Sequence, residues 1–270
     1  MPHGYYQMLM EFTTDAMLFV IQTMLCVLLF LVVERIRPIQ NIPLVNKEKI
    51  AEFSLMVVNT IFLQPFFYFV VLIAFTHTLK ELIPHQIFDA QIQNFPYILQ
   101  ILLGALLLDL KVYIRHRFTH NFMWRTHAVH HSATDISWLT GFRLHPSELL
   151  IDVIFTVPFM HVLGFSGESI AQATLIMFAF NLFTHTNINL EYPGLLRYII
   201  GSPNFHRWHH AKLEKQAYDK NFSVIFPFID LAFGSFYHPK GKLPQEYGVL
   251  SEAPINHSLR GYLGYPFRKI

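Results

Sequence analysis

Three histidine clusters in the sequence have the spacing of a single helical face. They are His116 and His120; His127, His130 and His131; and His206, His209 and His210. Residues at i and i+4, or at i, i+3 and i+4, lie on the same side of an α-helix, so each cluster would present converging imidazoles. Three such faces suffice to enclose two metal ions, and His185 is a ninth candidate ligand from a separate segment.

The ligand types available narrow the chemistry of such a site. Cys26 is the single cysteine and lies in an apolar run, which excludes an internal disulfide, a cysteine-type zinc site and a cysteine-held iron–sulfur cluster. Imidazole suits iron, zinc and copper better than magnesium or calcium, and a site without thiolates is consistent with iron that changes its redox state. The histidines interpreted as ordinary interfacial polar residues are His3, His77, His85, His238 and His257.

Other polar residues near the clusters are candidates for orienting the ligands. His145 precedes Pro146 in a loop and has no partner at helical spacing, so a positioning role is favoured and metal binding stays the alternative. A carboxylate that accepts the second ring N–H of a ligating imidazole fixes the orientation of that ring. The carboxylates considered for this role are Asp109, Asp135, Glu148 and Asp219.

Composition indicates where these clusters must be positioned. Hydrophobic residues make up 53% of the 270 residues and charged residues 14%, a balance typical of a membrane protein. The 27 Phe and 12 Tyr suit lipid contact and interfacial anchoring. The formal net charge of +2 is too small and too scattered for a nucleic-acid surface, so no nucleic-acid partner is expected.

Apolar stretches near the ~20 residues needed to cross a bilayer recur along the chain. They run over about residues 16–33, 53–75, 95–110, 149–163 and 170–183. The last three are short and carry polar residues such as Asp109, Asp152 and His161, which are costly in lipid. We therefore expect these helices to pack against one another.

Lys and Arg residues concentrate after the first, third and fifth stretches, which predicts an external N-terminus, five crossings and a cytoplasmic C-terminus. The fourth and fifth stretches then form a hairpin, and every histidine cluster falls on the cytoplasmic face. The expected fold is all-α: an integral, multi-pass membrane bundle of four to five transmembrane helices with a helical, histidine-rich cytoplasmic cap. Its expected parts are residues 1–94 with N-terminal transmembrane helices, 95–239 with the histidines, and a tail at 240–270.

Between about residues 109 and 239 the sequence resembles the fatty acid hydroxylase and sterol desaturase superfamily. The motifs occur in the order expected for that superfamily, which makes their joint signal specific. The matching stretches are Asp109–His120, Trp124–Ser132, Arg143–Glu148, Phe183–Asn187, Ser202–His210, Asp219–Asn221 and Asp230–Phe236.

The resemblance implies a catalytic domain at 95–239 in which the histidines hold two irons. Dioxygen activated there would abstract hydrogen from an unactivated C–H bond, giving hydroxylation or desaturation of a lipid such as a sterol, fatty acyl chain or ether lipid. Such a reaction consumes two electrons. The sequence contains neither a dinucleotide-binding G-x-G-x-x-G motif nor a haem domain, so these electrons imply a separate donor, such as a cytochrome b5-like protein or a ferredoxin with its reductase.

Two positions depart from the superfamily pattern. Members with a full histidine set tend to carry a second His four residues after the position of His185, where this chain has Asn189. Asn189 is therefore a further possible ligand, through its oxygen or through a water. Ile229 replaces a usual Trp, and we expect it to affect packing rather than chemistry.

Two other classes of function compete with the oxygenase. A haem-binding electron carrier needs axial histidines that face each other from opposed helices, whereas these clusters are dense and lie outside the apolar stretches. A metal-binding or transport protein needs polar positions along its membrane helices, where His161 is one of a scattered few. The sequence favours the oxygenase and leaves its substrate open.

Overall fold

The chain folds into helices joined by loops. The computed structural model describes residues 2–74, 92, 94–163, 165–250 and 256–268. Within these ranges no strand is present, and isolated β-bridges pair Pro38 with Ile188 and Ala211 with Tyr247. The prediction of an all-α fold is confirmed for the residues so described.

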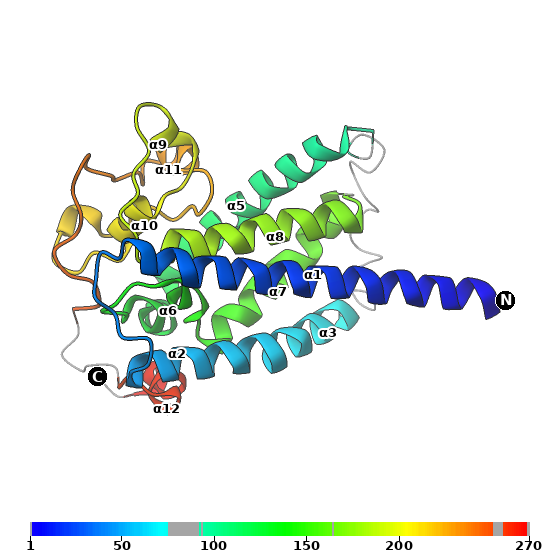
Figure 1. Ribbon diagram of the computed structural model, residues 1–270, viewed down its shortest axis with the longest axis horizontal. Coiled ribbons are helices and arrows are strands. Elements are labelled where there is room, and N and C mark those ends of the chain that lie inside the picture. Colours follow the sequence, from blue (N-terminus) through cyan, green and yellow to red (C-terminus); the bar gives the residue numbers. More distant parts are fainter. Residues whose placement is uncertain (1, 75–91, 93, 164, 251–255, 269–270) are drawn as a thin grey trace.

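Long helices provide the framework and short ones cluster at one end. The α-helices are α1 (Pro2–Ile36), α2 (Lys47–Val57), α3 (Gln64–Ala74), α5 (Tyr97–Phe122), α6 (Trp124–His131), α7 (Pro146–Leu163), α8 (Gly167–His185), α9 (Leu196–Ile199), α10 (Pro203–His209), α11 (Phe228–Ala232) and α12 (Leu259–Gly264). A π-helical turn, η1 (Val58–Leu63), joins α2 to α3, and the 3-10 turns are η3 (Trp138–Phe142), η4 (Lys215–Ala217) and η5 (Tyr265–Phe267). In Figure 1 α6, α9, α10, α11 and α12 lie at the end of the molecule away from the N-terminus.

The five apolar stretches fall within helices, apart from their edges and residue 75, which lies outside the described residues. Among the described residues, the helical segments Lys47–Val71 and Tyr97–Phe122 are long and apolar enough to cross a membrane. The number of crossings stays a prediction. Helix α5 continues for about three turns beyond the apolar stretch that ends at residue 110. It therefore includes the first histidine cluster, His116 and His120.

The π-helical turn has a local cause in Pro65. Proline has no N–H to donate and its ring crowds the carbonyl four residues earlier, so the regular α-helical hydrogen bonding is interrupted in the turn before it. The backbone N–H of Gln64 bonds instead to the carbonyl of Asn59, five residues back. The Asn59 side chain donates to the Leu144 carbonyl at 2.8 Å and ties this turn to the loop before α7.

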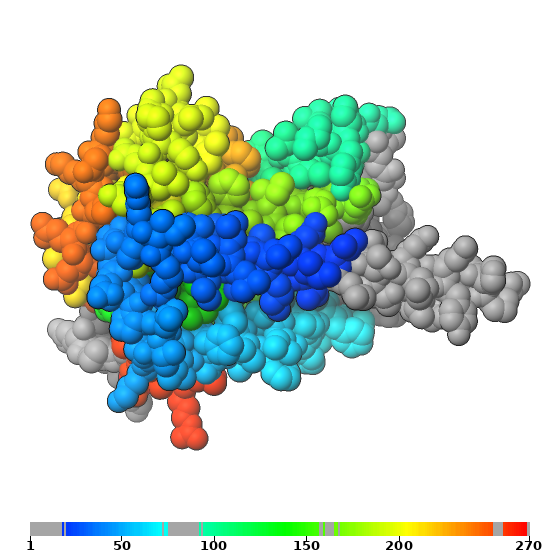
Figure 2. All heavy atoms as spheres, in the orientation of Figure 1, coloured from blue at the N-terminus to red at the C-terminus, as the bar shows by residue number. Residues whose placement is uncertain are grey.

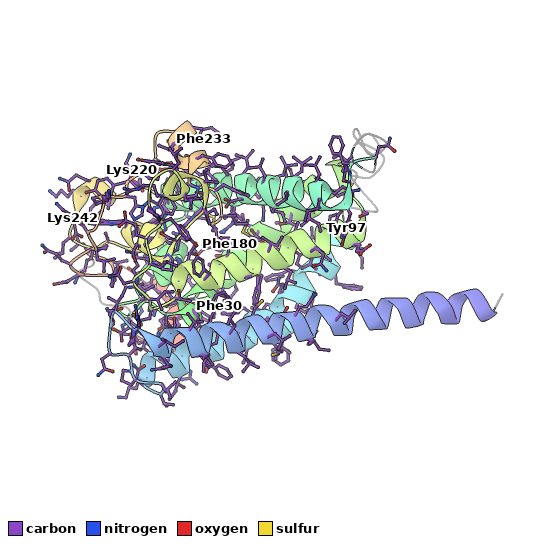
Figure 3. The ribbon with its side chains drawn as sticks, turned by 45° about the horizontal axis from the view of Figure 1, so that its top comes forward. Phe30, Tyr97, Phe180, Lys220, Phe233 and Lys242 are labelled. Carbon is purple, nitrogen blue, oxygen red and sulfur yellow. The ribbon has the colours of Figure 1, made fainter. Side chains whose placement is uncertain are left out.

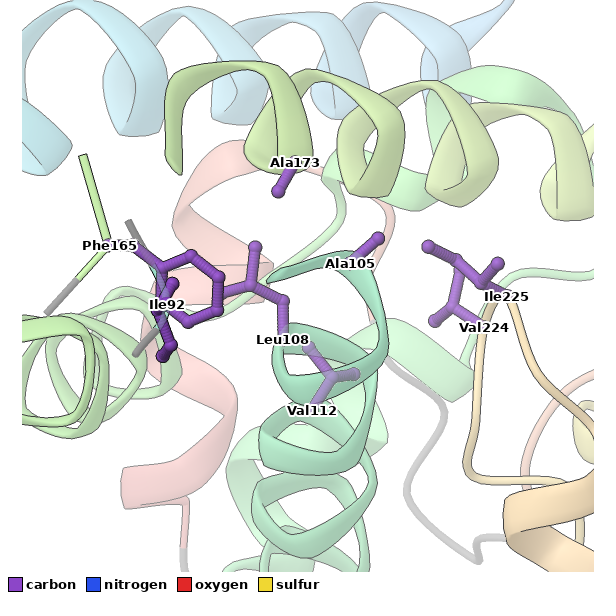
Figure 4. Close-up of a cluster of buried hydrophobic side chains, with 8 residues drawn as sticks. All are labelled: Ile92, Ala105, Leu108, Val112, Phe165, Ala173, Val224 and Ile225. Atoms are coloured by element: carbon purple, nitrogen blue, oxygen red, sulfur yellow. The ribbon is translucent and has the colours of Figure 1, made fainter. Parts of the chain in front are cut away.

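The main apolar core lies where α5 packs on α8. Figure 4 shows Ala105, Leu108 and Val112 of α5 between Ala173 of α8 and Val224 of a following loop. Small residues let the two helices approach closely: a Cβ placed on Gly104 would come 3.0 Å from the Cβ of Ala173. This packing holds the ends of α5 and α8, which carry histidines, at a fixed separation.

A buried carboxylate fixes the 224–226 loop against α5. Asp109 accepts hydrogen bonds from the backbone N–H groups of Val224, Ile225 and Phe226 at 2.7 to 2.9 Å. Asp109 therefore orients a loop. From the sequence, Asp109 was a candidate acceptor for the ring N–H of a ligating imidazole. On the other side of this loop, a Cβ on Gly201 would lie 2.1 Å from the Val224 carbonyl oxygen, so the close approach requires glycine.

The segment predicted as a C-terminal tail packs against the body of the molecule. Tyr262 and Tyr265 are buried in one apolar cluster with Leu55 of α2 and Val129 of α6. No periodic pattern in the sequence predicted this contact, because α12, the α-helix among the described residues of this segment, has six residues. The division of the chain at residues 94 and 239 stays a prediction.

Candidate metal centre

The structure brings the nine candidate histidines into two groups, within each of which the potential ligand atoms lie within 4.8 Å of one another. The first group is His116, His120, His127, His131 and His209, and the second is His130, His185, His206 and His210. All are buried except His120, which is partly buried.

Two short helices contribute to both groups. Helix α6 directs His127 and His131, four residues apart, to the first group and His130 to the second. Helix α10 begins where the Ser202 side chain accepts from the Phe205 N–H and Pro203 occupies the first turn. It supplies His209 to the first group, while His206 and the capping His210 belong to the second. Helix α5 supplies His116 and His120, and α8 ends on His185.

Hydrogen bonds at Nδ1 fix the orientation of several rings. Oxygen atoms that accept from ring Nδ1–H groups lie on Phe222 for His116 (2.9 Å), Glu148 for His127 (2.7 Å), Asp219 for His120 (3.1 Å), Asn181 for His185 (2.7 Å) and Lys220 for His209 (2.8 Å). Three of these acceptors are backbone carbonyls, which can only accept, so the matching Nδ1 atoms carry the proton. In a neutral ring the lone pair then resides on Nε2.

Several Nε2 atoms lie close to one another. Those of His116 and His127 lie 3.0 Å apart. Nε2 of His185 lies 2.9 Å from Nε2 of His206, whose Nδ1 has no hydrogen-bond partner among the described residues, so the proton of His206 is not confined to one nitrogen. Nδ1 of His116 donates to the Phe222 carbonyl, and when the Glu148 carboxylate accepts from Nδ1 of a neutral His127, no proton is left for a hydrogen bond between the two Nε2 atoms. A cation that accepts both lone pairs removes this repulsion.

Other ring nitrogens lack hydrogen-bond partners among the described residues. They include Nε2 of His209 and both ring nitrogens of His210, all buried. An unpaired buried polar atom costs free energy, and a metal ion is a suitable partner for an imidazole lone pair. The donor set, all imidazole with a carboxylate and carbonyls behind it, therefore fits transition metals such as iron.

Electrostatics favour the neutral, metal-binding form of these rings. Burial, with neighbouring imidazoles adding to the effect, lowers the pKa well below its ordinary value for the six histidines of the second and third clusters. They are His127, His130, His131, His206, His209 and His210. At neutral pH these side chains are therefore uncharged, the state in which an imidazole can bind a metal ion.

The remaining candidates lie in different places. Glu148 and Asp219 contact imidazoles of the first group, whereas the half-buried Asp135 accepts at its backbone carbonyl from Lys49 and Thr140. His145 bonds to Ser147 and to the Leu263 carbonyl, which is a positioning contact with the C-terminal segment. The exposed Asn189 accepts at Oδ1 from the Asn204 side chain. His77 and His85 lie outside the described residues.

The sequence did not single out a network of charges behind α6. The fully buried Arg143 donates to the Val129 carbonyl and the Ser132 hydroxyl of α6, and it forms ion pairs with Glu48 and Glu52 of α2. Glu48 and Glu52, one turn apart at the start of an apolar stretch, were the available signal, because buried acids need partners. This network connects α2 to the helix that serves both histidine groups.

A cavity of about 340 Å³ lies against the first group. Its lining includes His120, His131 and His209 together with Trp124 and Lys212. It lies at the end of the molecule where Figure 3 places Lys220 and Lys242, opposite Tyr97 at the start of α5.

The fold and the site define a helical protein with two buried polyhistidine groups at one end of its long helices. The sequence model described as fatty acid hydroxylase matches residues 101–235 of the 270, a segment that contains all nine histidines, and the chain belongs to this family.

Two curated relatives match beyond chance. The chain is 25% identical to ornithine lipid hydroxylase OlsE of Rhizobium tropici over 182 residues, which is 65% of the chain and 53% of the relative. It is 30% identical to alkylglycerol monooxygenase of Xenopus tropicalis over 152 residues, 55% of the chain and 32% of the relative. The chain thus matches about half of the first relative and a third of the second. No solved structure matches significantly.

Proposed function

We propose that the chain is a membrane oxidoreductase that hydroxylates a lipid with dioxygen, using two irons held by the two histidine groups. Family membership and two relatives named for lipid oxidation support the class of reaction. Both relatives are named for insertion of oxygen, which favours hydroxylation over desaturation.

One observation carries the metal assignment: the buried Nε2 lone pairs of His116 and His127 face each other at 3.0 Å. Iron bound at the two groups would supply the activation of dioxygen that attack on an unactivated C–H bond requires. The chain's own residues hold nine imidazoles in place, orient the His127 and His120 rings through Glu148 and Asp219, and keep bulk water away from the second group, whose members are all buried.

We place the long helices in a bilayer, with four to five crossings and the histidine end on the cytoplasmic face. Two helices long and apolar enough to cross a membrane support this arrangement, as do the basic side chains at the histidine end. We further propose that a separate electron donor, cytochrome b5-like or a ferredoxin with its reductase, approaches the 340 Å³ cavity because it borders the partly buried His120.

Lipid extracts from cells with and without the intact gene, compared by mass spectrometry, test the proposal. We expect one lipid class to gain one oxygen atom, and the purified chain to contain about two irons in mild detergent. Loss of two hydrogens instead would indicate desaturation and overturn the hydroxylase assignment. A Soret absorption band would indicate a haem protein, and an unchanged lipid profile with metal bound would indicate a metal-binding or transport protein.

A further inference from the structure

A second cavity, of about 750 Å³, lies apart from the cavity at the first histidine group. It is lined by α1, α2, η1, η3 and part of α8, with Met24, Val27, Leu31 and Phe53 among its lining residues, and it is partly open to the surface, where Met24 and Phe53 are exposed. Figure 2 shows the face of the molecule along which α1 and α2–α3 lie next to each other. The volume and the apolar lining are those of a ligand pocket rather than a packing defect.

The shape of this cavity is elongated. Its lining on α1 extends from Thr23 through Val27 and Leu31 to Arg35, a helical repeat that covers about 18 Å at 1.5 Å per residue. On the opposite side the π-helical turn contributes Thr60 and Ile61. A cavity of this form suits a linear hydrocarbon chain better than a rigid ring system.

Polar side chains gather at one end of the cavity. Glu34 accepts from the backbone N–H groups of Trp138 and Asn187, so its carboxylate is already used by the wall. Lys49 is buried in an ion pair with Glu52. Arg35 is exposed, its guanidinium donates to the Ile42 carbonyl, and no acidic side chain of the described residues forms an ion pair with it.

Turn η3 separates this polar end from the second histidine group. Trp138, Leu139 and Phe142 line the cavity on one side of the turn. On the other side a Cβ placed on Gly141 would come 3.3 Å from Nδ1 of His185. The polar end, and not the apolar end near Met24, is therefore the part of the cavity nearest to the histidines.

We propose that this cavity binds the hydrocarbon chain of one lipid molecule, with an anionic head group, carboxylate or phosphate, at Arg35 and the chain running along α1 toward Thr23. This deepens the proposed function and rests on it in one respect: the carbons oxidised are those next to the head group, because that end lies beside η3 and the second histidine group.

Fluorescence quenching tests the binding site without turnover. The full chain in nanodiscs of neutral lipid is titrated with a fatty acid brominated near its carboxyl end, which we expect to quench Trp138. Val27→Phe fills the cavity and should weaken binding about tenfold. Leu28→Phe, at the neighbouring exposed position outside the cavity, should leave the titration unchanged, and Trp138→Phe should remove the quenched signal.

Equal titrations for Val27→Phe and Leu28→Phe would refute the site. Quenching that is as strong when the bromine is at the methyl end of the chain would refute the orientation, since that end is expected near Thr23. Stronger quenching from the carboxyl-end bromine supports the orientation.

The head-group assignment has its own matched pair of variants. Arg35→Gln should weaken binding of the acidic probes, a brominated fatty acid and a brominated lysophosphatidic acid, about fivefold, and should not affect a neutral brominated monoacylglycerol. Arg37→Gln, two residues on and outside the cavity lining, should change none of these. Equal effects of both substitutions would overturn the role of Arg35, and the two acidic probes show which oxyanion it prefers.

These experiments can refute the lipid-binding cavity and the proposed function independently of each other. Quenching is measured on chain without iron, so unchanged quenching in Val27→Phe together with intact lipid oxidation in cells refutes the cavity alone. Binding as expected without any iron or oxidised lipid refutes the proposed function alone.

Discussion

The protonation of each imidazole is constrained by its surroundings. His116, His185 and His209 donate at Nδ1 to backbone carbonyls, which leaves Nε2 as the only nitrogen able to bind a metal. Such hydrogen bonds orient ligands and strengthen their basicity. The three Nε2 lone pairs are thus available to a metal ion without a change of tautomer.

Removal of one nitrogen from the second group should prevent metal binding there. We expect His130→Ala to reduce iron content by about half and to abolish lipid oxidation, because three imidazoles remain in a site built for four. Iron analysis of the purified variant measures this. His145→Ala is the control and should retain its iron, since His145 contacts Ser147 and Leu263; full iron content in His130→Ala would contradict the assignment.

Acid should destabilise the metal-free chain. Six buried imidazoles have pKa values well below the ~6.5 of an unfolded chain, so below that pH the unfolded state binds more protons. The stability they contribute is therefore complete above pH ~6.5 and is lost as pH falls. The melting temperature in detergent should decrease between pH 7 and 5, and less so in His130→Ala; a constant melting temperature would count against burial of these rings.

Spacing in the sequence predicted which histidines gather, and the structure brings all nine into two groups. It did not predict how they divide: His127 and His130 lie on one helical face, yet belong to different groups. That division depends on which partners α5, α8 and α10 bring close, and such contacts between distant segments leave no periodic signal. The loop-binding role of Asp109 was hidden for the same reason.

At the level of elements, the length of the apolar stretches located the long helices, because each contains a nearly continuous apolar run. Their ends were less predictable, since α5 continues through Lys111 and Arg115, which look like the start of a polar loop. Both side chains pair with Asp152 of α7, at 2.8 and 3.0 Å. A contact between helices thus supports polar residues that the local sequence would place outside them.

Arg143 should be essential for holding α6 in place. Arg143→Met leaves Glu48 and Glu52 buried without their partner, and loss of one member of a buried ion pair costs about 3–5 kcal/mol of folding free energy. We expect a clearly lower melting temperature by circular dichroism in detergent. The matched control is Arg125→Met, an arginine of α6 that donates to the Pro266 carbonyl near the surface and should have little effect; equal shifts for both would show that the network is unimportant.

At the scale of the whole molecule, the histidine end and the start of α5 should lie on opposite sides of a membrane. In a Cys26→Ser background, we expect Lys242→Cys to react with a membrane-impermeant maleimide only in inverted vesicles. Tyr97→Cys should react in intact cells, because Tyr97 is exposed at the other end of α5. Labelling of both from the same side would refute the predicted topology.

The segment matched by the family model and the wall of the elongated cavity lie largely in different parts of the chain. Residues 101–235 hold the nine histidines, whereas much of the cavity wall comes from α1 and α2, outside that segment. If the cavity binds the lipid and the histidine groups bind the metal, as proposed, helices outside the matched segment are the expected determinants of which lipid is chosen, and the histidine groups those of the kind of chemistry.

The two short helices that contribute to both histidine groups, α6 and α10, also fix the separation between the groups. Each carries imidazoles for one group and for the other within a single turn, in α6 as His127 and His130 and in α10 as His206 and His209. A helical turn is stiff, with a fixed rise of about 1.5 Å per residue. If two metal ions bind to these groups, as proposed, α6 and α10 set the distance between them, and a tilt of the long helices in bilayers of different thickness should leave that distance unchanged.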